Sequence, residues 1–233
     1  MSRSTRTKAG EAGPGRNAAA GARSSGRAAA PGRAVTPGRA APGAAHRVRI
    51  IGGDWKRTPL DVPDVPGLRP TPDRVRETLF NWLGQRLDGW RCLDAFAGTG
   101  ALGFEAASRG AARVVMIEND RRAQAAIARS IERLGAGDRM RLLGGDLFEL
   151  LPRLQTEGEQ FDLLLLDPPF GQGLPAAALP RLVPLLVPDA LIYVEAEAPF
   201  SPPAGFLMLR ADRAGQVHYH LLRRDDSAEQ EPT

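Results

Sequence analysis

Four residues suited to chemistry directly follow the apolar run 161–166, and they are Asp167, Pro168, Pro169 and Phe170. An exocyclic amine on a base is a poor nucleophile because its lone pair is delocalised into the ring. Two acceptors on its N–H bonds, the Asp167 carboxylate and the Pro168 carbonyl, would favour the tetrahedral nitrogen that attacks a methyl group. Pro169 keeps the turn rigid, and Phe170 offers a face on which the base stacks. We predict that these four residues are catalytic.

A glycine turn, Ala97-Gly98-Thr99-Gly100, lies upstream and follows another apolar run. Glycines let the backbone approach a ligand closely, and the N-terminus of the next helix supplies N–H donors. Acidic residues end the neighbouring predicted strands. Glu118 stands twenty residues after Gly98, a spacing that suits a carboxylate bound to the hydroxyls of a ribose. The pattern predicts a site for a nucleoside-containing cofactor.

Together the two turns predict the transfer of a methyl group to the nitrogen of a base. A methyl donor that carries a sulfonium is already activated. The main work of the protein is then to position the reactants in a dry site, which is worth effective molarities of about 10⁵ M or more. No metal ion and no covalent nucleophile is required. The predicted cofactor-binding residues are Asp94, Phe96, Gly98, Thr99, Gly100, Glu118, Asp146 and Leu147.

Two other classes of protein share part of this pattern. Gly98, Gly100 and Gly103 satisfy G-x-G-x-x-G, so a nicotinamide-dependent oxidoreductase is an alternative. Such an enzyme commonly needs Tyr with Lys, or His, near the reacting carbon, but no lysine or histidine follows a predicted core strand. A nucleic-acid-binding scaffold without catalysis would leave the strand-end acids and the Pro-Pro turn without a role. Asp146 taken alone is more typical of a helix cap than of a ligand.

Short apolar runs alternate with helical patterns from Cys92 onward, which predicts an α/β fold with a mostly parallel sheet. The predicted strands are 92–96, 114–117, 140–143, 161–166 and 191–194. The predicted helices are 99–109, 121–134, 147–154 and, interrupted by proline, 179–186. Two last strands, 206–209 and 217–222, predict a terminal antiparallel hairpin. In such a sheet ligands bind beyond the carboxyl ends of the strands.

Two elements precede this sheet. Residues 47–51 and 55–60 alternate around Gly52-Gly53-Asp54, which predicts a small β-hairpin, and a proline-rich connector follows up to residue 70. A helix then begins. Thr71 is the predicted N-cap and Pro72 the first helical residue, and apolar side chains recur at helical spacing as far as Leu87.

Positive charge is concentrated in residues 1–45. This segment holds eight Lys or Arg and one acidic residue, Glu11, so it carries a net charge of +7 while the remainder carries −3. It is rich in Ala, Gly, Pro and Ser and offers one large aliphatic side chain, Val35, so we predict a disordered tail. Such a polycation would add salt-sensitive affinity for nucleic acid phosphates. The alternatives are a tail with no essential function and an organelle transit peptide.

The composition limits the class of protein. With 233 residues, 42% of them hydrophobic, the chain is long enough for one main domain. We predict a tail (1–45), a hairpin and connector (46–70), the catalytic domain (71–224) and a polar C-terminal tail (225–233). The single cysteine, Cys92, excludes an internal disulfide framework and a multi-cysteine metal site. Because no apolar run approaches the roughly 20 residues that cross a bilayer, we expect a cytoplasmic protein with no membrane partner. We also expect a monomer.

Several stretches, spread in order over about residues 47–224, carry a family resemblance. They are Arg49–Gly53, Leu68–Leu83, Leu93–Gly103, Asp167–Phe170, Ala190–Glu195 and Ala214–Val217. These stretches resemble the bacterial 16S ribosomal RNA guanine-N2 methyltransferases of the RsmD type. Many amino-methylating enzymes share the glycine and Pro-Pro motifs, whereas the Arg69-Pro70-Thr71 helix start is typical of a much smaller set of enzymes. The tail lies outside the family pattern.

The resemblance implies the class I methyltransferase fold, a Rossmann-like sheet of seven strands, with S-adenosylmethionine as the methyl donor. It also implies that the target is a guanine N2 of 16S ribosomal RNA in a small-subunit particle or assembly intermediate. At matching positions, it assigns cofactor binding to five residues and base binding to Asp167 and Phe170. The five are Asp94, Gly98, Gly100, Glu118 and Asp146.

Arginines near the hairpin and the helix start are candidates for RNA contact. The predicted substrate-binding residues are Arg49, Trp55, Arg69, Thr71, Arg74 and Arg76. The arginines that open the helix suit an RNA phosphate or the donor's carboxylate equally, and those of the hairpin form a basic patch around Trp55. From the residues alone, guanine N2 and adenine N6 fit the same pair of acceptors, and RNA and DNA are both open. The resemblance favours guanine N2 in RNA.

Overall fold

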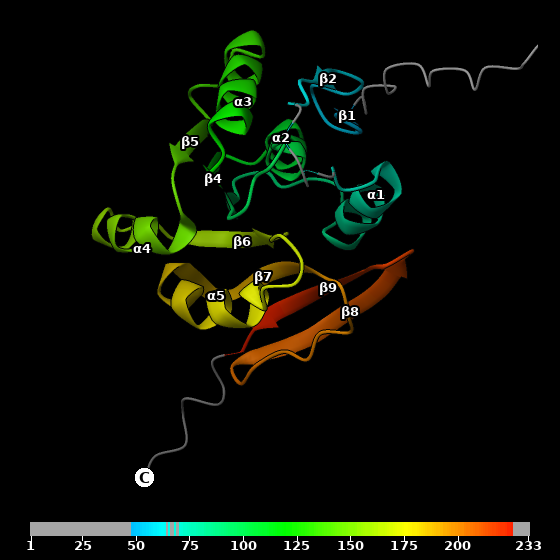
Figure 1. The fold of residues 1–233 in the computed structure, drawn as a ribbon, viewed down its shortest axis with the longest axis vertical. Helices are drawn as coiled ribbons and strands as arrows, with labels where there is room; N and C mark the ends of the chain where they lie inside the picture. Colours follow the sequence, from blue (N-terminus) through cyan, green and yellow to red (C-terminus); the bar gives the residue numbers. More distant parts are fainter. Residues whose placement is uncertain (1–47, 64, 66–67, 69, 226–233) are drawn as a thin grey trace, which may run out of the picture. The chain divides into compact units, whose positions relative to one another are not determined.

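Seven strands form one mixed sheet in the computed structural model, which describes residues 48–63, 65, 68 and 70–225 (Figure 1). The predicted tail and the last eight residues lie outside the described residues, as does Arg69. The sheet order is β5-β4-β3-β6-β7-β9-β8, which confirms the α/β prediction. Its strands are β3 (Arg91–Asp94), β4 (Arg113–Glu118), β5 (Met140–Gly144), β6 (Phe161–Leu166), β7 (Leu186–Ala196), β8 (Phe206–Ala214) and β9 (Val217–Arg224).

The first five of these strands run parallel, and β9 pairs antiparallel with both β7 and β8. The chain proceeds from β3 to β4 and β5 on one side, then crosses back to place β6 and β7 on the other side of β3. The strand order therefore reverses at β3. A crevice outside the carboxyl ends of the strands at such a switch point is the usual ligand site of an open α/β sheet.

Helices cover both faces of the sheet (Figure 1). One face packs against α1 (Asp73–Trp82), α2 (Ala101–Ser108) and α3 (Arg121–Arg133), and the other against α4 (Leu147–Thr156) and α5 (Leu174–Leu182). Successive strand residues point to opposite faces, so Cys92 lies in the first core cluster and Leu93 in the second. No helix in this described part of the chain is long and apolar enough to span a bilayer.

The segment before β7 differs from the expected helix at 179–186 and strand at 191–194. Helix α5 begins at Leu174, a 3-10 turn covers Val183–Leu185, and β7 already starts at Leu186. Gly173 enters α5 with a φ of 60°, and Pro175 lies in the first turn, where its missing N–H costs nothing. Helix α5 therefore begins five residues before the start that the sequence predicts. The terminal hairpin is confirmed, although β8 is five residues longer than expected.

Helix α1 begins at Asp73, with Pro72 at the N-cap position and no side-chain cap. The prediction that Thr71 caps the helix is wrong, because its hydroxyl donates a hydrogen bond to Asp167 at 2.9 Å. The helix ends at Trp82, since Gly84 and Gln85 adopt φ angles of 88° and 71°. Leu87 was expected in the helix but is buried in the loop that follows.

The N-terminal hairpin is shorter than expected. Strands β1 (Val48–Arg49) and β2 (Pro59–Leu60) pair antiparallel, as predicted, but each has only two residues. Ile50 still pairs across the hairpin, since its N–H donates to the Thr58 carbonyl at 2.9 Å. The next residues turn toward α2, because the backbone N–H groups at 51 and 52 donate to a side chain of that helix.

Candidate functional site

The carboxyl ends of three adjacent strands bring predicted site residues together. Glu118 is the last residue of β4, Asp94 the last of β3, and Asp167 the first after β6. Burial, followed by the negative charges of Asp167 and Glu118, raises the pKa of Asp94 to about 7, against the hydrogen bond from Gly103. This edge of the sheet is therefore an acidic centre in which the charges of Asp167 and Glu118 act on Asp94.

Asp94 has one buried oxygen that no described residue satisfies. Its Oδ2 accepts the Gly103 N–H at 2.9 Å, whereas its Oδ1 is buried without a hydrogen bond. Leaving a buried acceptor unsatisfied costs about 1–3 kcal/mol. A ligand N–H or O–H that reaches Oδ1 would remove that cost, so the residue suits a ligand that brings a hydrogen-bond donor.

The glycine turn is attached to Glu118. The Gly98 N–H donates to Glu118 Oε2 at 2.6 Å, and Oε1 accepts the Asp120 N–H at 2.7 Å. Gly98 and Gly100 have φ angles of 55° and 75°, and a Cβ at Gly100 would crowd Phe104. Burial raises the pKa of Glu118, and these N–H bonds oppose the rise. The turn and the half-buried carboxylate form one fixed unit at the start of α2.

Asp146 lies after β5 and is the N-cap of α4. Its Oδ1 accepts the N–H groups of Phe148 and Glu149 at 2.8 and 3.4 Å, so the helix-cap interpretation describes this oxygen. The side chain of Leu147 is packed in the second core cluster, and its backbone N–H is not one of those that the cap binds. Phe96 is half-buried and Thr99 is buried beside the glycine turn. Their predicted cofactor contacts stay predictions.

Asp167 is oriented by the connector that precedes α1. Thr71 Oγ1 donates to its Oδ2, across 96 residues of sequence. Burial raises the pKa of Asp167 to about 6, and the hydroxyl of Thr71 and the neighbouring Glu195 limit the rise. Pro168 is buried, whereas the Phe170 side chain is 44% exposed. The turn therefore presents an oriented carboxylate beside an aromatic ring that is open to a stacking partner.

A cavity of about 170 Å³ opens next to this turn. Its wall is formed by the Pro-Pro turn, the start of α5, and the end of β7 with the loop that follows. The lining includes Phe170, Phe200, Glu195 and Glu197. A mostly apolar hollow with aromatic rings and a few acceptors suits a flat ring that carries N–H donors.

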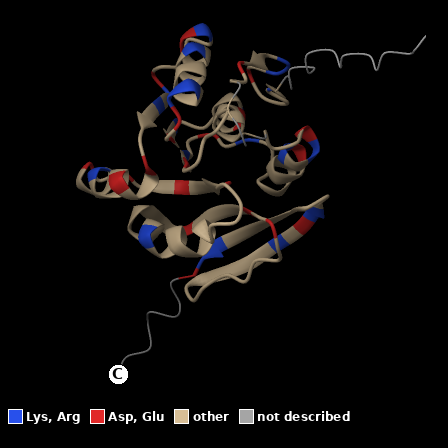
Figure 2. Ribbon diagram, in the orientation of Figure 1, with Lys and Arg blue, Asp and Glu red and all other residues tan. Residues whose placement is uncertain are grey.

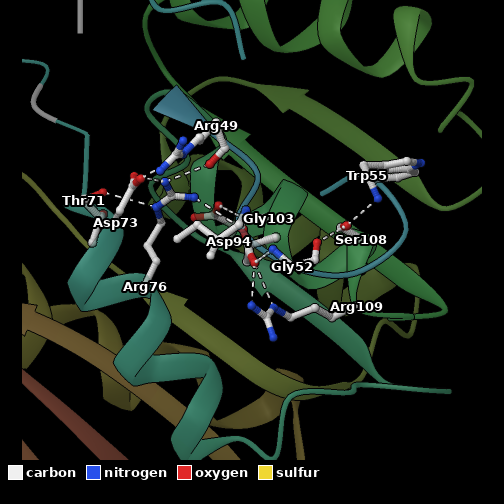
Figure 3. Close-up of polar contacts among 12 residues, drawn as sticks. Arg49, Gly52, Trp55, Thr71, Asp73, Arg76, Asp94, Gly103, Ser108 and Arg109 are labelled. Atoms are coloured by element: carbon white, nitrogen blue, oxygen red, sulfur yellow. Dashed lines mark hydrogen bonds and ion pairs between the residues drawn. The ribbon is translucent and has the colours of Figure 1, made fainter. Parts of the chain in front are cut away.

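Arg76 does not lie on the surface. Its side chain is fully buried, and its Nη2 donates to Asp73 Oδ1 at 2.7 Å and to the Arg49 carbonyl at 2.9 Å (Figure 3). Its Nη1 pairs with Glu105 Oε2 at 3.4 Å. The prediction that Arg76 contacts an RNA phosphate is wrong, because the guanidinium is enclosed by protein partners. Its role is to hold the hairpin and α1 against α2.

Glu105 of α2 is the buried centre of this arrangement. Its two carboxylate oxygens accept the N–H groups of Ile51 and Gly52 at 2.7 and 2.8 Å, and it pairs with Arg109 at 2.8 Å. Ser108 adds a bond from its hydroxyl to the Gly52 carbonyl at 2.6 Å. The Gly-Gly turn of the hairpin is therefore held against α2 by hydrogen bonds of its backbone groups.

The other described candidates for RNA contact differ in accessibility. Arg49 is 64% exposed and pairs with Asp73 at 3.3 Å, and Arg74 is exposed at the start of α1. The ring of Trp55 is half-buried, with the Arg139 guanidinium 4.7 Å from its centre. One face of this ring is thus covered by protein. Figure 2 shows Lys and Arg interspersed with Asp and Glu on α1 and α3.

The sequence interpretation missed three groups near the site. Glu195 directly follows the expected strand 191–194, just as Glu118 and Asp167 follow theirs, so the same rule applies to it. Tyr193, two residues earlier in β7, donates a hydrogen bond to Glu195 Oε1 at 2.8 Å. Phe200 lines the cavity from the loop after β7, where no periodic pattern marks it.

Comparisons with known proteins agree with this geometry. The family model described as Conserved hypothetical protein 95 matches residues 48–223. The chain is 42% identical to ribosomal RNA small subunit methyltransferase D of Escherichia coli strain K12 over 188 residues, 78% of this chain and 93% of that protein. It is 39% identical to the protein of the same name from Haemophilus influenzae over 187 residues, 78% of this chain and 96% of that protein.

Solved structures give the same result. The putative methyltransferase yhhF from Escherichia coli superposes with a TM-score of 0.68 at 42% identity, covering 77% of this chain and 98% of that one. The rRNA methyltransferase aviRa from Streptomyces viridochromogenes, at 19% identity and a TM-score of 0.54, shares the fold and covers 72% of this chain and 91% of that one. The chain therefore belongs to the Conserved hypothetical protein 95 family, together with the small-subunit ribosomal RNA methyltransferases D, and it is a methyltransferase with the class I fold.

Proposed function

We propose that this enzyme uses S-adenosylmethionine to methylate the exocyclic N2 of a guanine in 16S ribosomal RNA. The observation that carries the proposal is the Asp-Pro-Pro-Phe turn at the end of β6, whose carboxylate is oriented by Thr71 at 2.9 Å beside the glycine turn of β3. The names of the relatives support ribosomal RNA as the substrate. The guanine N2 rests on the resemblance of the Arg-Pro-Thr and Asp-Pro-Pro-Phe stretches.

The donor site is assigned to the ends of β3, β4 and β5. The unsatisfied Oδ1 of Asp94 would accept a hydrogen bond from an N–H group of the methyl donor. The Glu118 carboxylate, which also accepts the Gly98 N–H, would accept hydrogen bonds from the ribose hydroxyls. The first turn of α4, with Asp146 and the Leu147 N–H, faces the adenine. When bound, the donor supplies an electrophilic methyl group on a sulfonium. The missing side chains at Gly98 and Gly100 leave room for it.

The base site is assigned to the turn after β6 and the adjoining cavity. Asp167 and the Pro168 carbonyl accept the two amine N–H bonds and so favour a tetrahedral nitrogen. Phe170 stacks on the ring, an interaction worth about 1–3 kcal/mol. The apolar wall of the cavity excludes water from the reacting atoms. After transfer, Asp167 accepts the proton that the amine loses.

The substrate is proposed to be a small-subunit particle or an assembly intermediate, and the enzyme to act as a monomer. The exposed Arg49 and Arg74 lie at one end of the hairpin and at the start of α1, and they are proposed to contact RNA phosphates. Adenine N6 remains the chemical alternative, because its amine presents the same two N–H bonds to Asp167 and Pro168.

Mass spectrometry of nucleosides from 16S ribosomal RNA tests this function in a strain that lacks the gene. One N2-methylguanine is expected to disappear, to return with the wild-type gene, and to stay absent with Asp167→Ala. Asp138→Ala, a change at an exposed residue before the amino end of β5 and away from the carboxyl ends of the strands, is the matched control and is expected to restore the modification. Loss of a methyladenine instead would overturn the guanine assignment, and an unchanged methylation profile would overturn the substrate.

A further inference from the structure

A buried chain of hydrogen bonds leads from Asp167 into the neighbouring strand. Strands β6 and β7 are parallel with Leu166 opposite Val194, so Asp167 and Glu195 are neighbours across the sheet. Their carboxyl groups are therefore adjacent, and the charge of Asp167 raises the pKa of Glu195. The Tyr193 hydroxyl donates to Glu195 Oε1 at 2.8 Å. Glu195 is only 3% exposed, and the reaction described above gives it no role.

Two adjacent carboxyl groups can hydrogen-bond to each other only when one of them carries a proton, because ionised carboxylates are acceptors only. Two adjacent buried carboxylates also repel each other when both are ionised. The neighbouring Asp94 does not offset this repulsion, because it is itself acidic and the charge of Asp167 raises its pKa. The guanidinium of Arg76 donates to the Thr71 carbonyl at 3.3 Å, one step away from the pair. The ionisable groups around the pair are Asp94 of β3, Tyr193 of β7, Tyr219 of β9, which is opposite Glu195, and Arg76 of α1.

We propose that Glu195 is a positioning residue that keeps one proton and donates it in a hydrogen bond to Asp167, so that Asp167 stays ionised and aimed at the amine. This inference rests on the proposed function of the Asp-Pro-Pro-Phe turn. Each carboxyl group accepts one hydroxyl, so burial decides between them, and the proton belongs on Glu195 because Glu195 is the more buried of the two. In agreement, burial and then the charge of Asp167 raise the pKa of Glu195 well above its usual range, whereas that of Asp167 reaches about 6.

The proton balance of the reaction follows from this arrangement. As the N–C bond forms and the S–C bond breaks, the sulfonium becomes a neutral thioether and the amine nitrogen carries the surplus positive charge. Its extra proton passes to Asp167, so the pair changes from one proton to two. The second proton leaves to water when the product departs, and Glu195 keeps its own throughout.

Two substitutions at Glu195 separate proton donation from simple packing. Glu195→Gln keeps a neutral donor for Asp167, so kcat at pH 7.5 is expected to stay within about 3-fold of wild type. Glu195→Leu removes the donor, so kcat is expected to fall about 10- to 100-fold, as for loss of a hydrogen bond to a charged group. The acid limb of its pH–rate profile should move upward by about one unit, while KM for the particle changes less than kcat. Glu132→Gln, at an exposed residue of α3, is the control.

A titration without substrate tests the same proton directly. In protein labelled with ¹³C at glutamate carboxyls, one glutamate is expected to remain protonated at pH 8, and Glu195→Gln should remove that signal. The proposal is overturned if every glutamate is ionised at pH 8, if Glu195→Leu retains the wild-type rate and acid limb, or if Glu195→Gln is as impaired as Glu195→Leu. If the wild-type enzyme modifies no ribosomal RNA, the proposed function fails, and the titration still decides where the proton lies.

Discussion

The hydroxyl of Thr71 donates a hydrogen bond to the Asp167 carboxylate, so the N-terminus of α1 has no side-chain cap. Sequence spacing alone favours the cap, because Thr directly before a proline and an apolar periodic run is a common helix start. The correct partner lies 96 residues away, and the two meet only because the fold brings the connector before α1 to the end of β6. The Arg-Pro-Thr motif thus has a physical role, because its threonine orients the Asp167 carboxylate, which we propose to bind the base.

Replacing Thr71 by Val, which keeps the shape and removes the hydroxyl, tests this role. A hydrogen bond to a charged group is worth about 1.5–3 kcal/mol, so kcat/KM should fall about 10- to 100-fold. Thr71→Ser should retain most of the activity. Thr156→Val, whose hydroxyl donates to a backbone carbonyl at the exposed end of α4, is the matched control. Methylation of small-subunit particles from the deletion strain measures the effect, and equal loss in Thr156→Val would refute it.

Asp94 makes the stability of the donor-free enzyme depend on pH. Its pKa is raised to about 7 by burial, from a usual value of 3.8. The folded state therefore binds more protons than the unfolded state between these values, and the free energy of unfolding falls as pH rises through this window. The slope is about 1.4 kcal/mol per pH unit. From pH 5 to 8, wild type should lose about 2–3 kcal/mol more than Asp94→Asn in urea unfolding. Parallel losses in the two proteins would contradict the assignment.

At the scale of elements, the hairpin and α2 are joined at the Gly-Gly turn. Gly53 has a φ of 72°, and a Cβ there would overlap the Ser108 carbonyl in the backbone of α2. A backbone group cannot move aside as a flexible side chain does. The hairpin therefore stays docked only if residue 53 has no side chain.

Gly53→Ala should destabilise the protein more than a glycine substitution in open space. Gly84 is the matched control, because its φ of 88° imposes similar backbone strain while a Cβ there meets nothing within 4 Å. Strain alone costs about 1–2 kcal/mol, and overpacking adds about 1–3 kcal/mol at Gly53. Urea unfolding and proteolysis of residues 48–60 measure the difference. If Gly53→Ala and Gly84→Ala lose the same stability, the docking account is wrong.

The sequence predicts the core elements well and their ends poorly. Apolar runs locate β3 to β6 because buried parallel strands have few polar residues, and the strand-end rule then selects Asp94, Glu118 and Asp167. The start of α5 is misplaced because Pro175 and Gly173 resemble loop residues when their helix-start geometry is unknown. The burial of Arg76 is also hidden, since its partner Glu105 lies on another helix and neither charge looks internal in a single sequence.

At the scale of the whole molecule, charge is divided between the tail and the folded part. Residues 1–45 lie outside the described residues, and their net charge of +7 comes from the sequence. The predicted role of the tail is to add salt-sensitive affinity for RNA, while the strand-end site determines which atom is methylated. Positioning and chemistry would then reside in separate parts of the chain.

Deleting residues 1–45 tests that division. Each phosphate contact that is lost reduces the slope of log affinity against log salt by about 0.7–0.9. The truncated enzyme should show a higher KM for the particle at low salt, a shallower salt dependence, and an unchanged kcat. Kinetics at several salt concentrations provide the measurement, and replacing the eight basic residues of the tail by Gln gives the matched control for length. An identical salt dependence in all three proteins would eliminate the role of the tail.

Asp167→Asn provides the most direct measurement of the central claim, that the turn after β6 holds the amine while the glycine turn holds the donor. Donor binding by calorimetry and single-turnover methylation of small-subunit particles are measured on the same preparation. The donor Kd is expected to stay within about 3-fold of wild type, because Asp167 does not form the donor site. The methylation rate should fall at least 100-fold, since the amine loses an anionic acceptor. Methylation at the wild-type rate, or loss of donor binding in parallel with activity, would contradict the account.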